Sequence, residues 1–172
     1  MSIVIHSDDI KMRSWEINDA AELARIGNDS SIAFNMSDGF PNPYTEGKAI
    51  EFIKKARASN NLILAIEKNR RIIGSIGAFY DDNDKKRAVI AYFIGKEYWN
   101  NGFGTKAVKG ILEYLIKEKG ITVITADPFE RNHGSRKVLE KNGFRLVGII
   151  ENGSIKENKS INVSKYEYRV LS

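Results

Sequence analysis

The sequence contains no cysteine among its 172 residues, and it has only two histidines and three prolines. Without cysteine there can be no disulfide framework, thiol nucleophile, thiolate metal site or iron–sulfur cluster. The two histidines, His6 and His133, lie far apart in the chain and do not have the spacing of metal ligands. We therefore expect no metal site.

The chain also lacks a long apolar stretch. No run approaches the roughly 18 consecutive apolar residues of a membrane span. Residues 1–15 lack the basic segment followed by an apolar segment that marks a secretory signal. We therefore expect a cytoplasmic protein without a membrane partner. Its length suits a single domain over residues 1–172, because domains typically hold about 100–200 residues.

The net charge is +5, from 27 Lys and Arg against 22 Asp and Glu, which favours an anionic partner. The basic residues are scattered among acidic ones, and no aromatic-basic stacking motif is present. This distribution argues against nucleic acid.

Hydrophobic patterning predicts an α+β domain with a mixed, mostly antiparallel sheet of seven strands. Asp19 and Glu22 have the spacing of a capping box at a helix start, and Thr45 is a favoured residue for capping a second helix. The unit 87–126 has the pattern of a strand, a long helix and a parallel strand. The predicted strands are 10–15, 62–67, 72–80, 87–94, 121–126, 144–150 and 162–171, and the later helices are about 103–119 and 132–142.

The loop 98–105, Tyr-Trp-Asn-Asn-Gly-Phe-Gly-Thr, joins a strand to the long helix and places Gly102 and Gly104 at the helix start. Unpaired N–H groups and the helix dipole favour an anion there, and glycine leaves room for it. The order Thr105-Lys106 does not fit a phosphate-binding P-loop. Gly102, Gly104 and Ala107 do fit a dinucleotide fingerprint, with Asp127 as its acidic residue, although the expected repeated βαβ units are absent.

Two motifs resemble one known family, the GNAT superfamily of acetyl-coenzyme-A-dependent N-acetyltransferases, and within it the RimJ/RimL type. The first motif is the loop 98–105, in which Trp99 stands where most of the superfamily has Gln or Arg, as is typical of that branch. The second motif runs from Asn132-x-x-Ser135 to Gly143-Phe144. The resemblance covers nearly the whole chain, and it implies helices on both faces of the sheet and a central parallel strand pair that splays apart.

The resemblance implies acetyl-CoA as cosubstrate and direct transfer to a primary amine, either a protein N-terminus or a small-molecule amine. It places the diphosphate on the backbone of the glycine loop and the pantetheine arm beside the preceding strand. It also places Asn132 on the pantetheine and Ser135 at the departing sulfur, although an Asn before a helix is also a favoured N-cap. Arg131, Arg136, Lys137 and Lys141 are the candidates for contacts with the phosphates, although a solvated charged face is the default for any one of them. The expected backbone contacts are Tyr92, Phe93, Ile94, Asn100, Asn101, Gly102, Phe103, Gly104 and Thr105.

A carboxylate is the usual means of deprotonating an attacking amine. Glu151, just past the strand 144–150, is the first candidate for this base, followed by Asp127 and Glu130. The branch carries its Glu a few residues later, where this chain has Ser154. Any one of these carboxylates is more often a solvated surface charge than a base.

The sequence thus predicts an N-acetyltransferase, as a monomer or homodimer, whose loop 28–44 shapes the acceptor side. Two alternatives stay open at this point. One is a dinucleotide-dependent oxidoreductase, and the other is a coenzyme-binding protein without catalytic activity.

Overall fold

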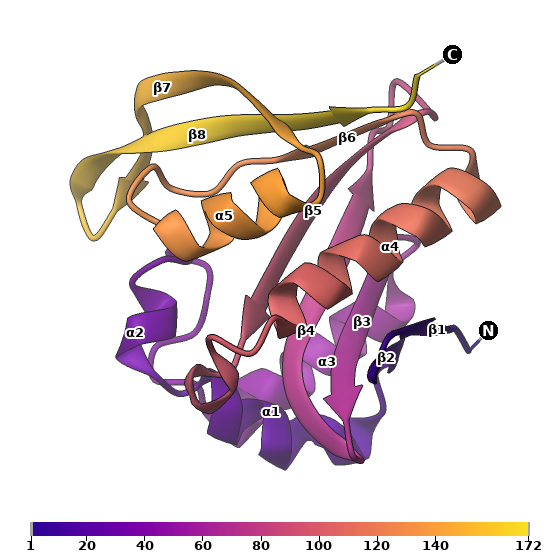
Figure 1. The fold of residues 1–172 in the computed structure, drawn as a ribbon. Helices are drawn as coiled ribbons and strands as arrows, with labels where there is room; N and C mark the ends of the chain where they lie inside the picture. Colours follow the sequence, from indigo (N-terminus) through magenta and orange to yellow (C-terminus); the bar gives the residue numbers. More distant parts are fainter. Residues whose placement is uncertain (1, 172) are drawn as a thin grey trace.

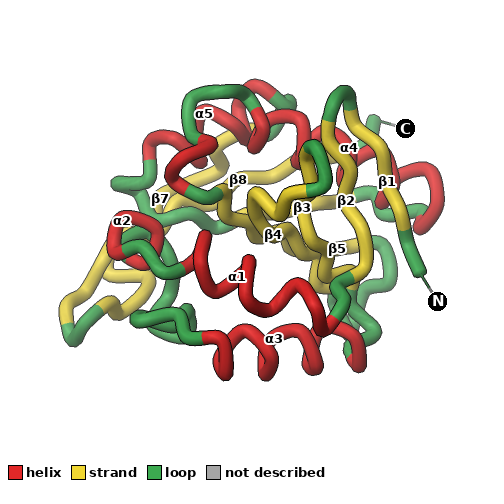
Figure 2. Tube along the Cα trace, turned by 90° about the horizontal axis from the view of Figure 1, so that it is seen from below, coloured by secondary structure: helices red, strands yellow, loops and turns green. Residues whose placement is uncertain are grey.

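The computed structural model describes residues 2–171, which form one twisted sheet between two layers of helices (Figures 1 and 2). Helices α1 and α3 lie on one face of the sheet, and α4 and α5 lie on the other. Within this range no helix is long and apolar enough to cross a membrane. The strands are β1 (Val4–Ser7), β2 (Ile10–Ser14), β3 (Leu62–Lys68), β4 (Arg71–Tyr80), β5 (Arg87–Ile94), β6 (Val123–Ala126), β7 (Arg145–Lys156) and β8 (Lys159–Arg169). The helices are α1 (Ala20–Gly27), α2 (Ser30–Ala33), α3 (Glu46–Ala58), α4 (Phe103–Lys119) and α5 (His133–Lys141), with 3-10 turns η1 (Ile17–Asp19) and η2 (Lys96–Tyr98).

Across residues 2–171 the sheet order is β1-β2-β3-β4-β5-β6-β8-β7, and the neighbours are antiparallel except for β5 and β6. The predicted α+β class and its parallel pair are confirmed. The predicted count of seven strands is wrong, because β1 adds an eighth. This strand has only four residues, and one of its two buried positions is Ser7, which donates to the Lys106 carbonyl at 2.7 Å. So short a strand with a polar inward residue gives a weak alternating pattern.

The last two strands are longer than predicted and form one hairpin. They meet at a turn in which Glu157 and Asn158 both have positive φ, 51° and 65°, without a glycine to signal it. Pairing is interrupted between Ile150 and Ser154, so Glu151 lies inside β7 at an irregularity and not beyond the strand end.

The expected capping box at α1 is also wrong. The box forms one turn earlier, between Glu16 and Asp19, at the start of η1. Glu22 instead reaches the sheet, where its Oε1 accepts from the backbone N–H of Ile72 at 2.9 Å and from Arg71 Nε at 2.7 Å. The tertiary contact with β4 therefore replaces the local one.

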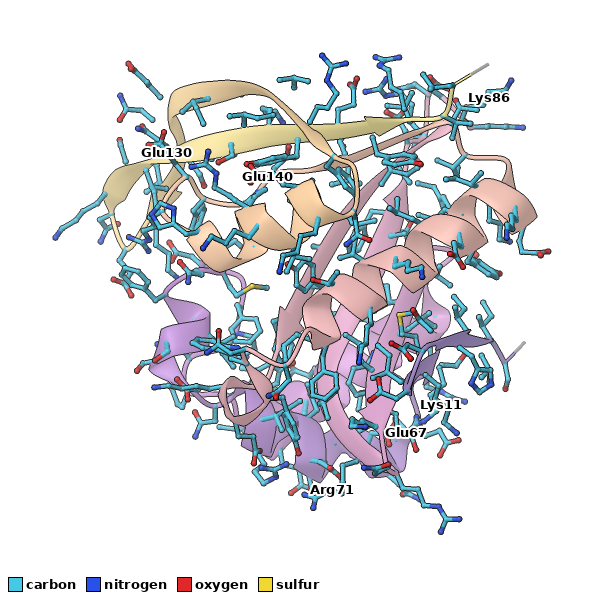
Figure 3. The ribbon with its side chains drawn as sticks, viewed as in Figure 1. Lys11, Glu67, Arg71, Lys86, Glu130 and Glu140 are labelled. Atoms are coloured by element: carbon cyan, nitrogen blue, oxygen red, sulfur yellow. The ribbon has the colours of Figure 1, made fainter. Side chains whose placement is uncertain are left out.

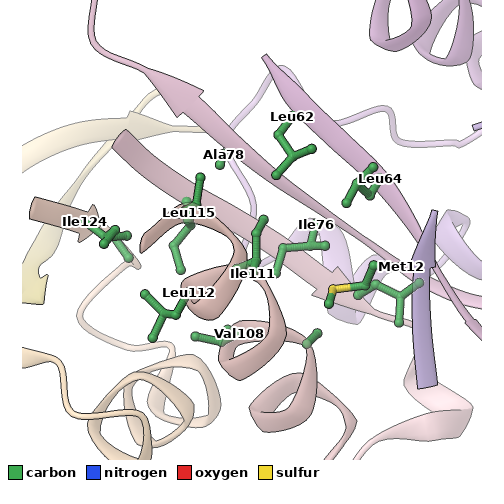
Figure 4. Close-up of a cluster of buried hydrophobic side chains, with 14 of the residues drawn as sticks. Met12, Leu62, Leu64, Ile76, Ala78, Val108, Ile111, Leu112, Leu115 and Ile124 are labelled. Carbon is green, nitrogen blue, oxygen red and sulfur yellow. The ribbon is translucent and has the colours of Figure 1, made fainter. Parts of the chain in front are cut away.

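Two hydrophobic cores hold the layers together. Figure 4 shows the first, in which Val108, Ile111, Leu112 and Leu115 of α4 pack on the sheet around Ile76. The second lies between the other face and α1 and α3, and includes Trp15, Leu23, Ile53 and Phe93. Neighbouring residues of β5 serve different cores, since Ile94 belongs to the first and Phe93 to the second. The sheet is therefore buried on both faces at β5.

An ion network fastens the start of the chain to the sheet. Glu67 of β3 is largely buried and accepts from Arg13 Nε at 2.6 Å, while Arg13 also pairs with Asp19 at 2.8 Å. Lys11 and Glu67 lie side by side on neighbouring strands (Figure 3), 3.7 Å apart. The Asp19 and Glu67 carboxylates raise the pKa of Arg13 above its ordinary value, so its charge is fixed.

The parallel pairing of β5 with β6 is very short. It runs from Arg87 opposite Val123 to Val89 opposite Thr125 and then stops, whereas β5 continues to Ile94 alongside β4. Beyond Val89, the edge of β5 that faces β6 has no strand partner within residues 2–171. The predicted splayed pair is confirmed, and it opens toward the carboxyl end of β5.

The close approach of β4 and β5 depends on a glycine at this point. A Cβ at Gly74 would lie 2.3 Å from the Phe93 carbonyl oxygen. We expect Gly74→Ala to destabilise the fold by about 1–3 kcal/mol, because rigid backbone must move. Urea unfolding measures this, with Gly148→Ala as the control, since a Cβ there has no neighbour within 4 Å. Equal stability of the two variants would contradict the close approach.

Candidate functional site

A cavity of about 540 Å³ lies where β5 and β6 separate. Its walls come from the end of β5, the loop before α4, the first turns of α4 and α5, and the α2 region (Figure 1). The lining residues are Ser31, Ile32, Asn35, Met36, Tyr92, Phe93, Ile94, Tyr98, Trp99, Asn100, Gly102, Phe103, Gly104, Thr105, Arg131, Asn132, His133, Gly134, Ser135, Lys137, Val138 and Lys141.

The glycine loop presents an open helix terminus to this cavity. Gly102 is the N-cap of α4, has φ +78°, and offers no side chain to cap the helix. The N–H groups of the first helical turn have no partner within the helix, and they add to the positive end of its dipole. This arrangement suits a phosphate.

A tryptophan fixes the loop to the end of β5. Trp99 Nε1 donates to the Ile94 carbonyl at 2.7 Å. The side chain of Asn101 turns back to the Tyr98 and Trp99 carbonyls, at 3.2 and 2.9 Å. Of the predicted loop residues, Asn101 is therefore the one that supports the loop and does not line the cavity.

Strand register decides which backbone groups of β5 face the opening. Gly95 N–H donates to the Ile73 carbonyl, and opposite residues of an antiparallel ladder alternate between bonded and unbonded pairs. The backbone N–H and C=O of Phe93 therefore face Ser75 on β4, whereas those of Tyr92 and Ile94 face away from β4. Of the three predicted backbone contacts with the cofactor on β5, the one at Phe93 is therefore less favourable than those at Tyr92 and Ile94, because the backbone groups of Phe93 already face β4.

Helix α5 contributes two polar residues that the sequence also singled out. Asn132 caps α5, with its Oδ1 accepting from the Ser135 N–H at 3.2 Å. Its Nδ2 makes no hydrogen bond within residues 2–171, so one side of the amide stays available. The Ser135 hydroxyl accepts from the Tyr92 hydroxyl at 3.1 Å.

The charged groups at the cavity are basic. Lys137, Lys141 and Arg131 line it, and none of its lining residues in the described part of the chain is acidic. Arg136 points elsewhere, since its Nε donates to the Tyr166 hydroxyl at 3.1 Å. The lining therefore favours an anionic ligand.

The three predicted carboxylates lie outside the cavity lining. Asp127 pairs with Lys165 at 3.0 Å, and Glu130 accepts from Asn162 Nδ2 at 3.1 Å (Figure 3 labels Glu130). Glu151 is exposed on β7. The structure thus brings together the predicted coenzyme residues other than Asn101, and it does not bring the predicted base to them.

Sequence reasoning missed the α2 wall, formed by Ser31, Ile32, Asn35 and Met36, and the role of the Tyr92 side chain. The loop 28–44 was expected on the acceptor side, but no local pattern indicates which of its residues meet α5. The contact is made just before α5, where the Arg131 guanidinium lies 3.5 Å from the centre of the Phe34 ring.

A family model described as "Acetyltransferase (GNAT) domain" matches residues 9–145, well over half of the chain. The chain belongs to the GNAT acetyltransferase family.

Similar proteins carry related names. The uncharacterized N-acetyltransferase p20 of Bacillus licheniformis is 22% identical over 166 residues, 92% of each chain. The uncharacterized N-acetyltransferase YnaD of Bacillus subtilis is 26% identical over 162 residues, 93% of this chain and 92% of the relative.

Solved structures share the fold at low identity. A GNAT-family acetyltransferase from Bacillus anthracis has a TM-score of 0.88 at 20% identity and covers 97% of this chain and 98% of its own. The microcin C7 self immunity acetyltransferase MccE, solved with acetyl-CoA and AMP, has a TM-score of 0.83 at 22% identity, with coverage of 95% and 93%. RimJ of Mycobacterium smegmatis, in complex with CoA-disulfide, has a TM-score of 0.84 at 18% identity, with coverage of 98% and 87%.

GNAT acetyltransferases use acetyl-CoA, and the cavity of this GNAT protein fits such a group. The open terminus of α4 and the basic lining suit its phosphates. A Cβ at Gly104 would lie 3.4 Å from Tyr92 Cε2 and 3.5 Å from Val138 Cγ2, so the glycine faces the space between β5 and α5. The family match also leaves the oxidoreductase alternative without support.

Two tyrosines, the buried Tyr44 and the partly buried Tyr92, should make this GNAT fold sensitive to alkali. Burial raises the pKa of Tyr92 to about 12 and that of Tyr44 to about 12. Since an unfolded tyrosine ionises near pH 10, the stabilisation is complete below about pH 10 and is lost as the pH rises toward 12. We expect the free energy of unfolding in urea to fall over that interval, and to fall less steeply in Tyr44→Phe. An identical slope in the variant would contradict the burial effect.

Proposed function

We propose that this protein transfers the acetyl group of acetyl-CoA directly to a primary amine, as an N-acetyltransferase of the RimJ/RimL type. The observation that carries the proposal is the cavity at the β5–β6 splay, which joins an open helix N-terminus to free strand backbone and to Ser135. Acetyl-CoA would supply a thioester, whose carbonyl carbon an amine can attack directly, without a covalent enzyme intermediate.

Different residues along the cavity would bind different parts of acetyl-CoA. The first turn of α4, from Phe103 to Thr105, would bind the diphosphate, with Lys137 and Lys141 adding positive charge. The backbone groups of Tyr92 and the N–H of Ile94 would pair with the pantetheine amides, as would Asn132 Nδ2, since the Ile94 carbonyl already accepts from Trp99. A strand N–H aimed at the thioester carbonyl would stabilise the developing oxyanion, and one such donor is typically worth about 3–4 kcal/mol.

The acceptor amine must lose a proton. Glu151 stays our first candidate for the base, and its exposed place on β7 would require it to act through water. His133 lines the cavity and is the second candidate. A protein N-terminus or a small-molecule amine would approach from the side of α2 and loop 28–44, where Arg131 stacks on Phe34.

A ligand panel tests the coenzyme assignment. Acetyl-CoA should raise the melting temperature by mass action, whereas NAD and an oligonucleotide should not. Stabilisation by NAD without an effect of acetyl-CoA would refute the proposal.

Turnover needs a separate assay of thiol release from acetyl-CoA with peptide N-termini, amino sugars and polyamines. We expect release above background with at least one class of amine. Binding of acetyl-CoA without release with any of these amines would favour the binding protein that lacks catalysis.

Gly104→Val tests the loop. The added methyl groups would fill the space toward Tyr92 and Val138, so we expect the Kd for acetyl-CoA to rise about tenfold, or about 1.4 kcal/mol. Gly148→Val on β7 is the matched control, because its Cβ meets no neighbour within 4 Å. Equal affinity for acetyl-CoA in both variants would show that the diphosphate does not bind at this loop.

A further inference from the structure

One hydrogen bond crosses the opening between β5 and α5. The Tyr92 hydroxyl on β5 donates to Ser135 Oγ on α5, at 3.1 Å. β6 leaves β5 after Val89, and α5 is the next helix after β6 in the chain (Figure 1). Both residues line the cavity, so this bond lies within its wall.

The Tyr92 ring lies beside the first turn of α4, since a Cβ at Gly104 would lie 3.4 Å from its Cε2 atom. It also packs against the core beneath α4. These contacts keep the Tyr92 hydroxyl oxygen within hydrogen-bond distance of Ser135 Oγ.

Ser135 is restrained through two atoms. Asn132 Oδ1 accepts from its backbone N–H, and Tyr92 occupies one lone pair of its Oγ. A serine hydroxyl has one hydrogen and two lone pairs, and a phenol is a better donor than an alcohol. The Ser135 hydrogen is therefore not used by Tyr92, and no other hydrogen bond involves this hydroxyl within residues 2–171.

We propose that Tyr92 is a positioning residue for acetyl transfer, which holds the Ser135 hydroxyl with its hydrogen directed toward the departing sulfur of coenzyme A. This inference rests on the proposed function. Nothing in the backbone pairing expected of Tyr92 requires a hydroxyl, so the side chain carries a role separate from the main chain.

The chemistry balances without consuming either residue. The amine nitrogen forms a bond to the acetyl carbon, and the carbon–sulfur bond breaks with its electron pair going to sulfur. The amine loses a proton and the sulfur gains one, so the products are an amide and a thiol. Ser135 donates a hydrogen bond to the sulfur as its charge develops, and Tyr92 strengthens that donor by donating to the serine oxygen.

The test is a double-mutant cycle on kcat, measured by thiol release with saturating acetyl-CoA and the best amine of the panel. We expect Tyr92→Phe to lower kcat about five- to tenfold and to leave the Kd for acetyl-CoA within about twofold, because the ring and backbone stay in place. Ser135→Ala should lower kcat further. The double variant should be no slower than Ser135→Ala alone, since Tyr92 acts through the serine.

Ser135→Thr supplies a second readout. It retains a hydroxyl, so we expect Tyr92→Phe to lower its kcat by a factor similar to that in the wild type. Tyr168→Phe is the matched control for removing a tyrosine hydroxyl. Tyr168, in β8, packs on Phe144 and does not line the cavity. Its kcat should equal that of the wild type.

Three results would overturn the inference. They are an unchanged kcat in Tyr92→Phe, multiplicative losses in the double variant, or a loss confined to acetyl-CoA affinity. If the wild type turns over and Tyr92→Phe equals it, only the positioning role fails. If the wild type binds acetyl-CoA but releases no thiol with any amine, the proposed function and this inference fail together.

Discussion

The candidate site of this protein exists because β5 and β6 are paired over only part of the length of β5. Strands β5 and β6 are paired only from Arg87 to Val89 on the β5 side, after which β6 turns away and β5 continues against β4. A strand edge is a row of hydrogen-bonding groups that must find partners. Here the edge is neither covered by another strand nor simply left at the surface, because α5 and the glycine loop enclose it in a cavity. A ligand with amide groups can then take the place of the missing strand.

The rest of the fold keeps this gap open. On one side, β5 cannot follow β6, because it is fixed to β4 by the close approach at Gly74 and belongs to cores on both sheet faces. On the other side, β6 is paired with β8, which carries the C-terminal hairpin. Trp99 then connects the end of β5 to the loop before α4. The open strand edge and the positive helix terminus are thus held next to each other by packing that does not involve the ligand.

Much of this arrangement could be predicted from the sequence, for identifiable physical reasons. The stripe Val108, Ile111, Leu112 and Leu115 has helical spacing, and all four side chains are buried. Gly102 and Gly104 mark the loop, because Gly102 has a positive φ and Gly104 adds no side chain to the space beside Tyr92 and Val138. Local signals were less informative where long-range contacts decide the outcome. The Glu22 carboxylate has capping spacing but accepts from the Ile72 N–H at the start of β4, and β1 is stabilised by pairing with β2 more than by its own pattern.

By itself the sequence determined the order of the elements, the family resemblance and the residue types around the glycine loop, because these depend on spacing along the chain. Tertiary structure alone decided which side chains meet. The Tyr92–Ser135 hydrogen bond joins residues 43 positions apart, and the contact of Arg131 with Phe34 joins residues 97 positions apart. It also decided that Glu151 lies outside the cavity lining. Such contacts depend on strand register and helix packing across the whole domain, which no local pattern specifies.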